Sequence, residues 1–327
     1  MVFGQSGLGS QYQESRLSRL DQKAIWRVRI LLFGKNGQIG SRLQGPLSTI
    51  AEVVAVGRSQ LDLENFANLQ SILESHQPDV IVNAAAYTNV ERAEVDSTRA
   101  HNINCGAVKV MARYAAREGI VLVHYSSDYV FDGKKQEPYS EQDATSPLNV
   151  YGATKRDGED AIRSEQCRHL ILRTSWVYSS RGANFANAIL DLARERDVLH
   201  VVADQIGSPT SARLVAQSTA DILTHLRRSS WPKDADGTYH LAASGATSWY
   251  GFARLLVREA HRLGVKLRCS PERVIAINST EYATRVKRPA NSRLSTEKVL
   301  KAFGLSLPNW SNEVPPMVSD FAKGERN

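Results

Sequence analysis

A short apolar run followed at once by a glycine-rich loop constrains the fold more than any other feature. Residues 28–33 read VRILLF and residues 34–40 read GKNGQIG. The apolar run is typical of a strand buried on both faces. Gly34, Gly37 and Gly40 let a backbone approach a pyrophosphate closely, and the helix that follows offers free N–H groups to its charge. This context predicts a dinucleotide-binding loop, although a glycine-rich turn without a ligand gives the same pattern.

Strand and helix patterns alternate through the first half of the chain. Further strand-like runs occupy residues 52–57, 79–86, 120–131, 169–178 and 199–204. Helical apolar spacing occupies residues 63–76, 98–119 and 184–196. Repeated strand–helix–strand order predicts an α/β fold, a Rossmann-like doubly wound parallel sheet with helices on both faces. The more mixed second half predicts a smaller C-terminal substrate-binding lobe.

The length of 327 residues exceeds a usual single core, so two lobes are expected. We assign residues 27–174 to a dinucleotide-binding domain, with a later segment near 198–225 returning to it. Residues 175–327 then form mainly the substrate-binding lobe. Residues 1–26 are polar and mixed in charge, and we interpret them as a poorly ordered N-terminal extension.

Composition excludes several classes of protein. No apolar run approaches the ~18–20 residues that span a membrane. The three cysteines have no metal-ligand spacing and suit a reducing cytoplasm. The net charge of +7 permits an anionic partner, but the chain has no long Lys/Arg run and no nucleic-acid motif. We therefore expect a cytoplasmic enzyme that binds an anionic small molecule, with no membrane or nucleic-acid partner.

Residues 151–155 read YGATK, which places Tyr151 and Lys155 one helical turn apart. The pattern is weak alone, because chance produces it in many chains. A lysine ammonium beside a tyrosine favours the phenolate and lowers the phenol pKa, which makes the pair a general acid/base. A hydroxyl from a neighbouring strand should orient the phenol, and Ser126 and Ser127 lie where the fourth predicted strand ends. The pair therefore predicts proton transfer coupled to hydride transfer, provided that the glycine loop binds a nicotinamide cofactor.

Several segments together resemble the extended short-chain dehydrogenase/reductase family, and within it most closely the dTDP-4-dehydrorhamnose reductases. They run in family order over roughly residues 28–300 and read ILLFGKNGQIG, PDVIVNAAAYTNVERAE, HYSSDYVFDG, SPLNVYGATKRDGE, LRTSWVY, NFANAIL, DQIGSPT and RPANSRLSTEK. The resemblance implies NADPH-dependent reduction of dTDP-4-dehydro-L-rhamnose, a dTDP-4-keto-6-deoxy sugar, to dTDP-L-rhamnose. It also implies the Rossmann-like fold and allows a homodimer.

The resemblance assigns roles to individual residues. Tyr151 is implied to be the proton donor, Lys155 its electrostatic partner and a ribose ligand, and Ser127 the adjacent hydroxyl, where the family more often has threonine. The residues implied to line the cofactor are Gly34, Gly37, Gln38, Ile39, Gly40, Asp62, Leu63, Ala85, Ala86, Tyr87 and Tyr125. The residues implied to contact substrate are Ser127, Asp128, Trp176, Arg288 and Arg293. Each of these outside the catalytic set also has an ordinary structural interpretation, such as packing, capping or a surface ion pair.

The cofactor preference is predicted at the end of the second strand. NAD-preferring folds usually carry an acid there, which binds the ribose 2′-hydroxyl and repels a 2′-phosphate. Here the position is Gly57, and Arg58 follows with a guanidinium that suits a phosphate. We expect NADPH to be preferred and NADH to remain possible, although Arg58 also fits an exposed loop arginine.

Some members of the family are described with magnesium held between subunits by glutamates. Two of the matching positions here are Arg42 and Arg213. Arginine cannot ligate Mg²⁺, which prefers oxygen ligands. We therefore expect no metal.

Two alternative functions remain open from the sequence. Related sugar-nucleotide epimerases and dehydratases share the fold, but dehydratases usually place an Asp-Glu pair after the strand-four hydroxyl, where this chain has Ser127-Asp128-Tyr129. A non-catalytic regulatory subunit similar to the methionine adenosyltransferase beta subunit shares the SSDYVFDG-type stretch. The RTSWVY and DQIGSPT segments favour the reductase.

Overall fold

The computed structural model describes residues 28–229, 231–232, 235–282 and 286–324, so the predicted extension at residues 1–26 lies outside the described residues. The strands are β1 (Arg29–Phe33), β2 (Glu52–Val56), β3 (Val80–Asn83), β4 (Val121–Ser127), β5 (Arg168–Thr174), β6 (Val177–Tyr178), β7 (Leu199–Val202), β8 (Ile206–Gly207), β9 (Thr210–Ser211), β10 (Gly237–His240), β11 (Thr247–Ser248) and β12 (Val274–Ile277). The helices are α2 (Gln38–Ser48), α3 (Phe66–His76), α4 (Val90–Ala93), α5 (Ser97–His101), α6 (Ala107–Glu118), α7 (Val150–Ser164), α8 (Phe185–Glu195), α9 (Ala212–Arg228), α10 (Trp249–Arg262), α11 (Glu297–Phe303) and α12 (Val314–Ala322).

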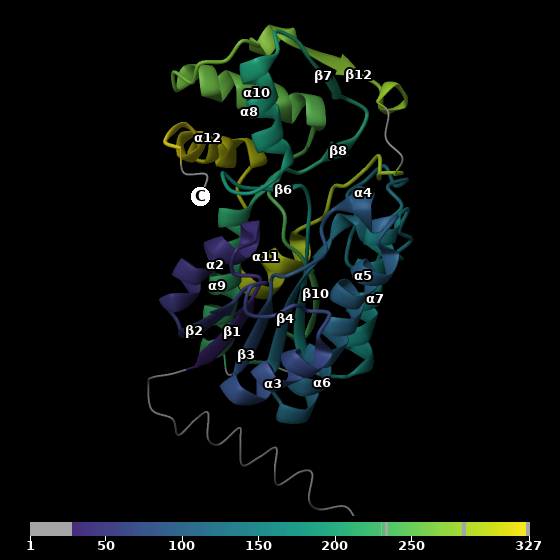
Figure 1. Ribbon diagram of the computed structural model, residues 1–327, viewed down its shortest axis with the longest axis vertical. Helices are drawn as coiled ribbons and strands as arrows, with labels where there is room; N and C mark the ends of the chain where they lie inside the picture. Colours follow the sequence, from purple (N-terminus) through teal and green to yellow (C-terminus); the bar gives the residue numbers. More distant parts are fainter. Residues whose placement is uncertain (1–27, 230, 233–234, 283–285, 325–327) are drawn as a thin grey trace, which may run out of the picture.

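Six strands form one parallel sheet in the order β10-β5-β4-β3-β1-β2 (Figure 1). This confirms the predicted Rossmann-like fold. From β1 the chain builds outward to β2, and it then crosses back to build β3, β4, β5 and β10 on the other side. The carboxyl ends of β1 and β3 therefore flank a switch point, where open α/β sheets bind ligands.

Helices cover both faces of the sheet, as Figure 1 shows. On one face Leu43 and Leu47 of α2 share a buried cluster with Val215 of α9. On the other face Leu69 of α3 and Met111 of α6 belong to a second buried cluster. The central strands are apolar on both sides because each face needs its own core.

A second lobe packs α8, α10 and α12 around a core of its own (Figure 1). Within it β7 pairs in parallel with β12. The predicted strand at 199–204 therefore does not join the main sheet, and β10 is the sixth strand there. His200 of β7 is exposed while its neighbours are buried, a pattern that suits a two-stranded ribbon rather than a doubly covered sheet. Of the segment near 198–225, α9 is the part that packs on α2.

Within the described residues, no helix is both long and apolar enough to span a bilayer. All three cysteines are free thiols, and Cys167 and Cys269 are buried.

Candidate active site

Helix α7 carries the predicted catalytic pair. It begins after Asn149, whose side chain accepts a hydrogen bond from the Gly152 N–H at 2.8 Å. Residue 152 is glycine because a Cβ there would lie 2.1 Å from the Tyr129 carbonyl oxygen. The first turn therefore sits directly on the turn that follows β4, with Tyr151 and Lys155 on one helix face.

The carboxyl end of β4 supplies a hydroxyl and a carboxyl group to the same place. The Ser127 hydroxyl donates to Asp128 Oδ1 at 3.0 Å and accepts from the Tyr129 N–H at 3.1 Å. The Tyr129 ring meets the Tyr151 ring edge-on, with centroids 5.5 Å apart. A hydrogen bond also links Ser127 to Tyr151. The structure thus brings three predicted residues, Ser127, Asp128 and Tyr151, together.

Burial dominates the protonation of these groups. It raises the pKa of Tyr151 to about 12, against the opposing hydrogen bond with Ser127. It also raises the pKa of Asp128 to about 6. Lys155 is not among the groups that shift the pKa of Tyr151, and its role as the electrostatic partner of the phenol remains a prediction.

Lys155 is 2% exposed and contacts β4 rather than Tyr151. Its Nζ donates to the main-chain carbonyl of Tyr125 at 2.6 Å and lies 3.1 Å from His124 Nε2. Burial lowers the pKa of Lys155 to about 8. The pKa of Tyr151 and the pKa of Lys155 are therefore determined by different neighbours.

The glycine loop lies at the switch point. Gly34 has φ +86°, and a Cβ there would lie 2.7 Å from the Ala85 N–H nitrogen, so only glycine fits. Gly40 packs so closely that a Cβ would lie 2.0 Å from the Gly34 carbonyl oxygen. Gly37 precedes α2 and provides no side-chain cap, so the helix N-terminus keeps free N–H groups. These are features of an anion-binding helix start.

The remaining loop residues lie where the cofactor prediction needs them. Gln38 and Ile39 form the first turn of α2, and Gln38 Oε1 accepts from the Ser179 hydroxyl at 3.3 Å. Ala85 and Ala86 follow β3, the neighbour of β1 in the sheet.

Two basic residues lie beside the end of β2, where the sequence analysis predicted only Arg58. Arg58 is exposed beside the buried Gly57. Lys35 of the glycine loop covers the same glycine, because a Cβ at Gly57 would lie 3.2 Å from Lys35 Cε. Gln60 holds the lysine Nζ at 2.6 Å and also accepts from the Gly57 N–H at 3.1 Å. The sequence signal for Lys35 was its position directly after Gly34, inside the GxxGxxG loop.

Three residues that were predicted to contact the cofactor have partners within the protein. Asp62 pairs with Arg99 at 3.7 Å, and Leu63 is buried in the core on the α3 face. The Tyr87 hydroxyl donates to Asp96 at 3.0 Å. Their contact with a cofactor remains a prediction.

Tyr125 lies in the core rather than on an open surface. Its hydroxyl is 2.7 Å from Thr219 Oγ1 of α9, and its ring is buried in the cluster on the α2 face. What Tyr125 brings to the site is its main-chain carbonyl, which accepts from Lys155.

Trp176 is held between two neighbours. Its ring stacks on Trp249 with centroids 3.4 Å apart, and a Cβ at Gly207 would lie 2.4 Å from the Trp176 ring. Trp176 also has φ +47°, a strained value for a bulky residue. Trp249 therefore covers one face of the ring, and the contact of Trp176 with a substrate remains a prediction.

The two candidate phosphate ligands both have protein partners. Arg288 pairs with Glu91 of α4 at 3.1 Å. Arg293 donates to Asn291 Oδ1 at 2.9 Å and to the Gln136 carbonyl oxygen. Substrate would have to compete with these bonds.

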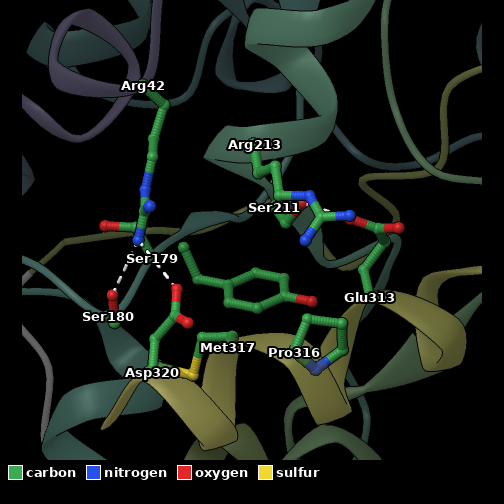
Figure 2. Close-up of a pocket in the computed structure, with 10 residues that line it drawn as sticks. Arg42, Ser179, Ser180, Ser211, Arg213, Glu313, Pro316, Met317 and Asp320 are labelled. Carbon is green, nitrogen blue, oxygen red and sulfur yellow. Dashed lines mark hydrogen bonds and ion pairs between the residues drawn. The ribbon is translucent and has the colours of Figure 1, made fainter. Parts of the chain in front are cut away.

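Arg42 and Arg213 line a small pocket that α2 and α9 form with α12 of the second lobe (Figure 2). Arg42 donates to Asp320 at 3.0 Å and to Ser180 at 2.9 Å. The described part of the chain holds no group of three His, Cys, Asp or Glu residues that could bind a metal ion.

Sequence reasoning missed two buried polar residues next to the lysine, Asn83 and His124. The signal was available, because each interrupts or ends an apolar strand, VIVN or VLVHYSS. A polar side chain in a doubly covered strand needs a partner inside the protein.

Comparison with known proteins agrees with this geometry. The family model described as RmlD substrate binding domain matches residues 28–323. The dTDP-4-dehydrorhamnose reductase of Escherichia coli K12 is 44% identical over 299 residues, covering 90% of this chain and 98% of the relative. The enzyme of the same name from Burkholderia thailandensis is 42% identical, covering 90% and 99%.

Solved structures give the same result. The dTDP-4-dehydrorhamnose reductase of Bacillus anthracis in complex with NADP is 30% identical with a TM-score of 0.79, covering 90% of this chain and 99% of that one. A UDP-glucose 4-epimerase from Thermus thermophilus, at 16% identity, shares the fold alone. By its sequence and its fold, the chain belongs to the RmlD family of dTDP-4-dehydrorhamnose reductases.

Proposed function

We propose that this protein reduces dTDP-4-dehydro-L-rhamnose to dTDP-L-rhamnose with NADPH. One observation carries the proposal: Tyr151, Ser127 and Asp128 meet at the carboxyl end of β4, and the glycine loop follows β1 of the same sheet. The curated relatives that share this family carry the same enzyme name over nearly their whole length.

The glycine loop fits a dinucleotide. The free N–H groups at the start of α2 suit a pyrophosphate. The positive charges of Lys35 and Arg58, beside Gly57, suit the 2′-phosphate of NADPH. A structural neighbour of this chain was solved with NADP. When bound, NADPH supplies the hydride that the ketone carbon accepts.

Residues of α7 and β4 then supply the proton that the ketone oxygen takes up. With its pKa raised to about 12, Tyr151 is protonated at neutral pH and is ready to donate. The Ser127 hydroxyl orients the phenol. Asp128, with a pKa of about 6 and Oδ1 bound to Ser127, would accept a hydrogen bond from a sugar hydroxyl.

Neither alternative function has comparable support. A dehydratase needs a further acid/base after the strand-four hydroxyl, and Tyr129 occupies the position usual for glutamate. The epimerase likeness extends to the fold alone. A regulatory subunit has no need of a buried Tyr–Ser–Asp cluster.

The test is a single assay with purified protein, NADPH and dTDP-4-keto-L-rhamnose made in situ. We expect NADPH consumption that depends on the sugar nucleotide, with dTDP-L-rhamnose as the product. Absence of turnover, together with stoichiometric capture of methionine adenosyltransferase, would favour the regulatory role. We also propose a cytoplasmic location, and a homodimer if the protein assembles.

A further inference from the structure

A chain of buried polar groups runs from Lys155 into the sheet. Lys155 Nζ lies 3.1 Å from His124 Nε2, and His124 Nδ1 lies 3.1 Å from Asn83 Nδ2. Asn83 and His124 face each other in the register of β3 and β4. Their exposed fractions are 1% and 0%, and that of Lys155 is 2%. Because these groups are buried, their hydrogen bonds are made mainly with partners inside the protein.

One donor of fixed orientation determines where each proton lies along this series of hydrogen bonds. The main-chain N–H of Ala85 donates to Asn83 Oδ1 at 3.1 Å. The other end of the amide, the NH₂ group, must then face His124, so Nδ1 of the imidazole accepts. A neutral imidazole with a bare Nδ1 carries its proton on Nε2, and that proton points at Lys155. An ammonium has no lone pair, so it cannot accept from Nε2–H.

We propose that Asn83 and His124 favour the neutral amine form of Lys155 over its ammonium form, and so act as positioning residues for the catalytic lysine. The neutral amine accepts from His124 Nε2–H with its lone pair and donates one hydrogen to the Tyr125 carbonyl oxygen at 2.6 Å. This inference rests on the proposed function in treating Lys155 as catalytic.

Burial shifts the protonation of both groups in the same direction. It lowers the pKa of Lys155 to about 8, so that the neutral amine predominates above that pH, and it lowers the pKa of His124 well below its usual value. On α7, Glu159 lies one turn beyond Lys155 and favours its charged form, but Arg173 of β5 holds that carboxylate at 2.8 and 2.6 Å. Tyr151, on the same helix, stays neutral at physiological pH.

Charging Lys155 requires a coordinated rearrangement. The imidazole proton must move from Nε2 to Nδ1, and the Asn83 amide must turn so that its oxygen accepts that proton. The Ala85 N–H then loses its acceptor. Ala85 touches the glycine loop at Gly34, so the charge of the lysine is coupled to the strand end that lines the cofactor.

The first test is nitrogen NMR of the imidazole in purified protein without added cofactor, with the His124 signals assigned by their loss in His124→Gln. Above pH 8, where the neutral amine predominates, we expect a protonated Nε2 and a bare Nδ1 in the wild type. An imidazole with its proton on Nδ1, or on both nitrogens, above pH 8 overturns the proposal. This result needs neither turnover nor any variant in the measured sample.

The second test reverses the proton order with Asn83→Asp, a change of nearly the same shape. The carboxylate accepts from both Ala85 N–H and His124 Nδ1–H, which leaves Nε2 bare to accept from an ammonium. The limb of the kcat/KM pH profile near pH 8 should then move upward by about one unit. Thr219→Val, which breaks a buried bond to Tyr125 elsewhere on β4, should leave that limb in place.

The two failures are distinguishable. If Asn83→Asp loses activity equally at every pH and its imidazole tautomer is unchanged, the proposed roles of Asn83 and His124 are overturned. The proposed reductase function is not affected by that result. A wild type with the expected tautomer but no turnover of the dTDP-sugar contradicts the proposed function, while the inference about Asn83, His124 and Lys155 stands.

Discussion

Arg42 of α2 and Asp320 of α12 form an ion pair of 3.0 Å that joins the helix after the glycine loop to the second lobe. Their side chains are 27% and 31% exposed, and the hydroxyl of Ser180 accepts a further bond from the same guanidinium. Partial shielding and the second bond give this pair a fixed geometry that freely exposed pairs lack. Arg42 is one of the two arginines on which the expectation of no metal rests.

We therefore predict that activity and assembly survive EDTA. A guanidinium cannot bind Mg²⁺, and Asp320 is already neutralised by Arg42. Turnover and size-exclusion profiles should match with and without the chelator, and any dimer should form without a bridging ion. Loss of activity in EDTA with rescue by Mg²⁺ would contradict this.

Replacing Tyr151 with phenylalanine removes the proposed proton donor and keeps the ring. Turnover should fall by roughly 10²–10⁴-fold, the usual contribution of general acid catalysis, while NADPH still binds. Tyr178→Phe is a matched control, because it removes another buried hydroxyl, one without a hydrogen-bond partner among the described residues. Near-normal turnover of Tyr151→Phe would remove the phenol from the mechanism.

Lys155→Met should lower turnover and also weaken NADPH binding, because the lysine is expected both to support Tyr151 and to bind the nicotinamide ribose. Single-turnover rates and titration of cofactor fluorescence separate the two effects. Lys298→Met is the control, since Lys298 also donates to a main-chain carbonyl, that of Thr238 at 2.7 Å. Intact cofactor affinity in the Lys155 variant would leave it only the electrostatic role.

Arg58→Ala should raise the KM for NADPH and leave NADH kinetics nearly unchanged. If a contact with a charged phosphate contributes about 1.5–3 kcal/mol, the specific loss is about 10- to 100-fold. Arg113→Ala removes another exposed arginine, which pairs with Glu165, and should change neither cofactor. Equal losses with NADPH and NADH would mean that Arg58 supports the local fold instead.

Glu159 should contribute to stability at neutral pH and lose that contribution in acid. Burial raises its pKa, but hydrogen bonds and charge from Arg173 outweigh burial, and the pKa in the folded protein is lowered. A lowered carboxyl pKa stabilises the fold above the unfolded value of about 4.3, and this stabilisation is lost as pH falls through the folded value.

Urea unfolding between neutral and acidic pH checks this expectation. Glu159→Gln should be less stable than the wild type at neutral pH, with a weaker decline in the free energy of unfolding below about pH 4.3. Glu297→Gln, which breaks an exposed pair with Lys301, should behave like the wild type. The same acid dependence in Glu159→Gln and the wild type would show that other carboxylates dominate.

The amino-acid sequence alone predicted a parallel sheet, the glycine loop and the helix of Tyr151 and Lys155. These features follow from local patterns: doubly buried strands read as apolar runs, and residues four apart share a helix face. Gly34 is decided almost as locally, because its positive φ permits little else.

The partners that these residues contact depend on three-dimensional packing. The strand at 199–202 pairs with β12, some seventy residues later, and its own letters do not distinguish that partner from the main sheet. Lys155 contacts His124 because the register of β3 and β4 and the packing of α7 bring residues 83, 124 and 155 to one buried point. There the desolvation of each group depends on the others, so the charge of the lysine is a property of the assembled core and not of the YGATK motif.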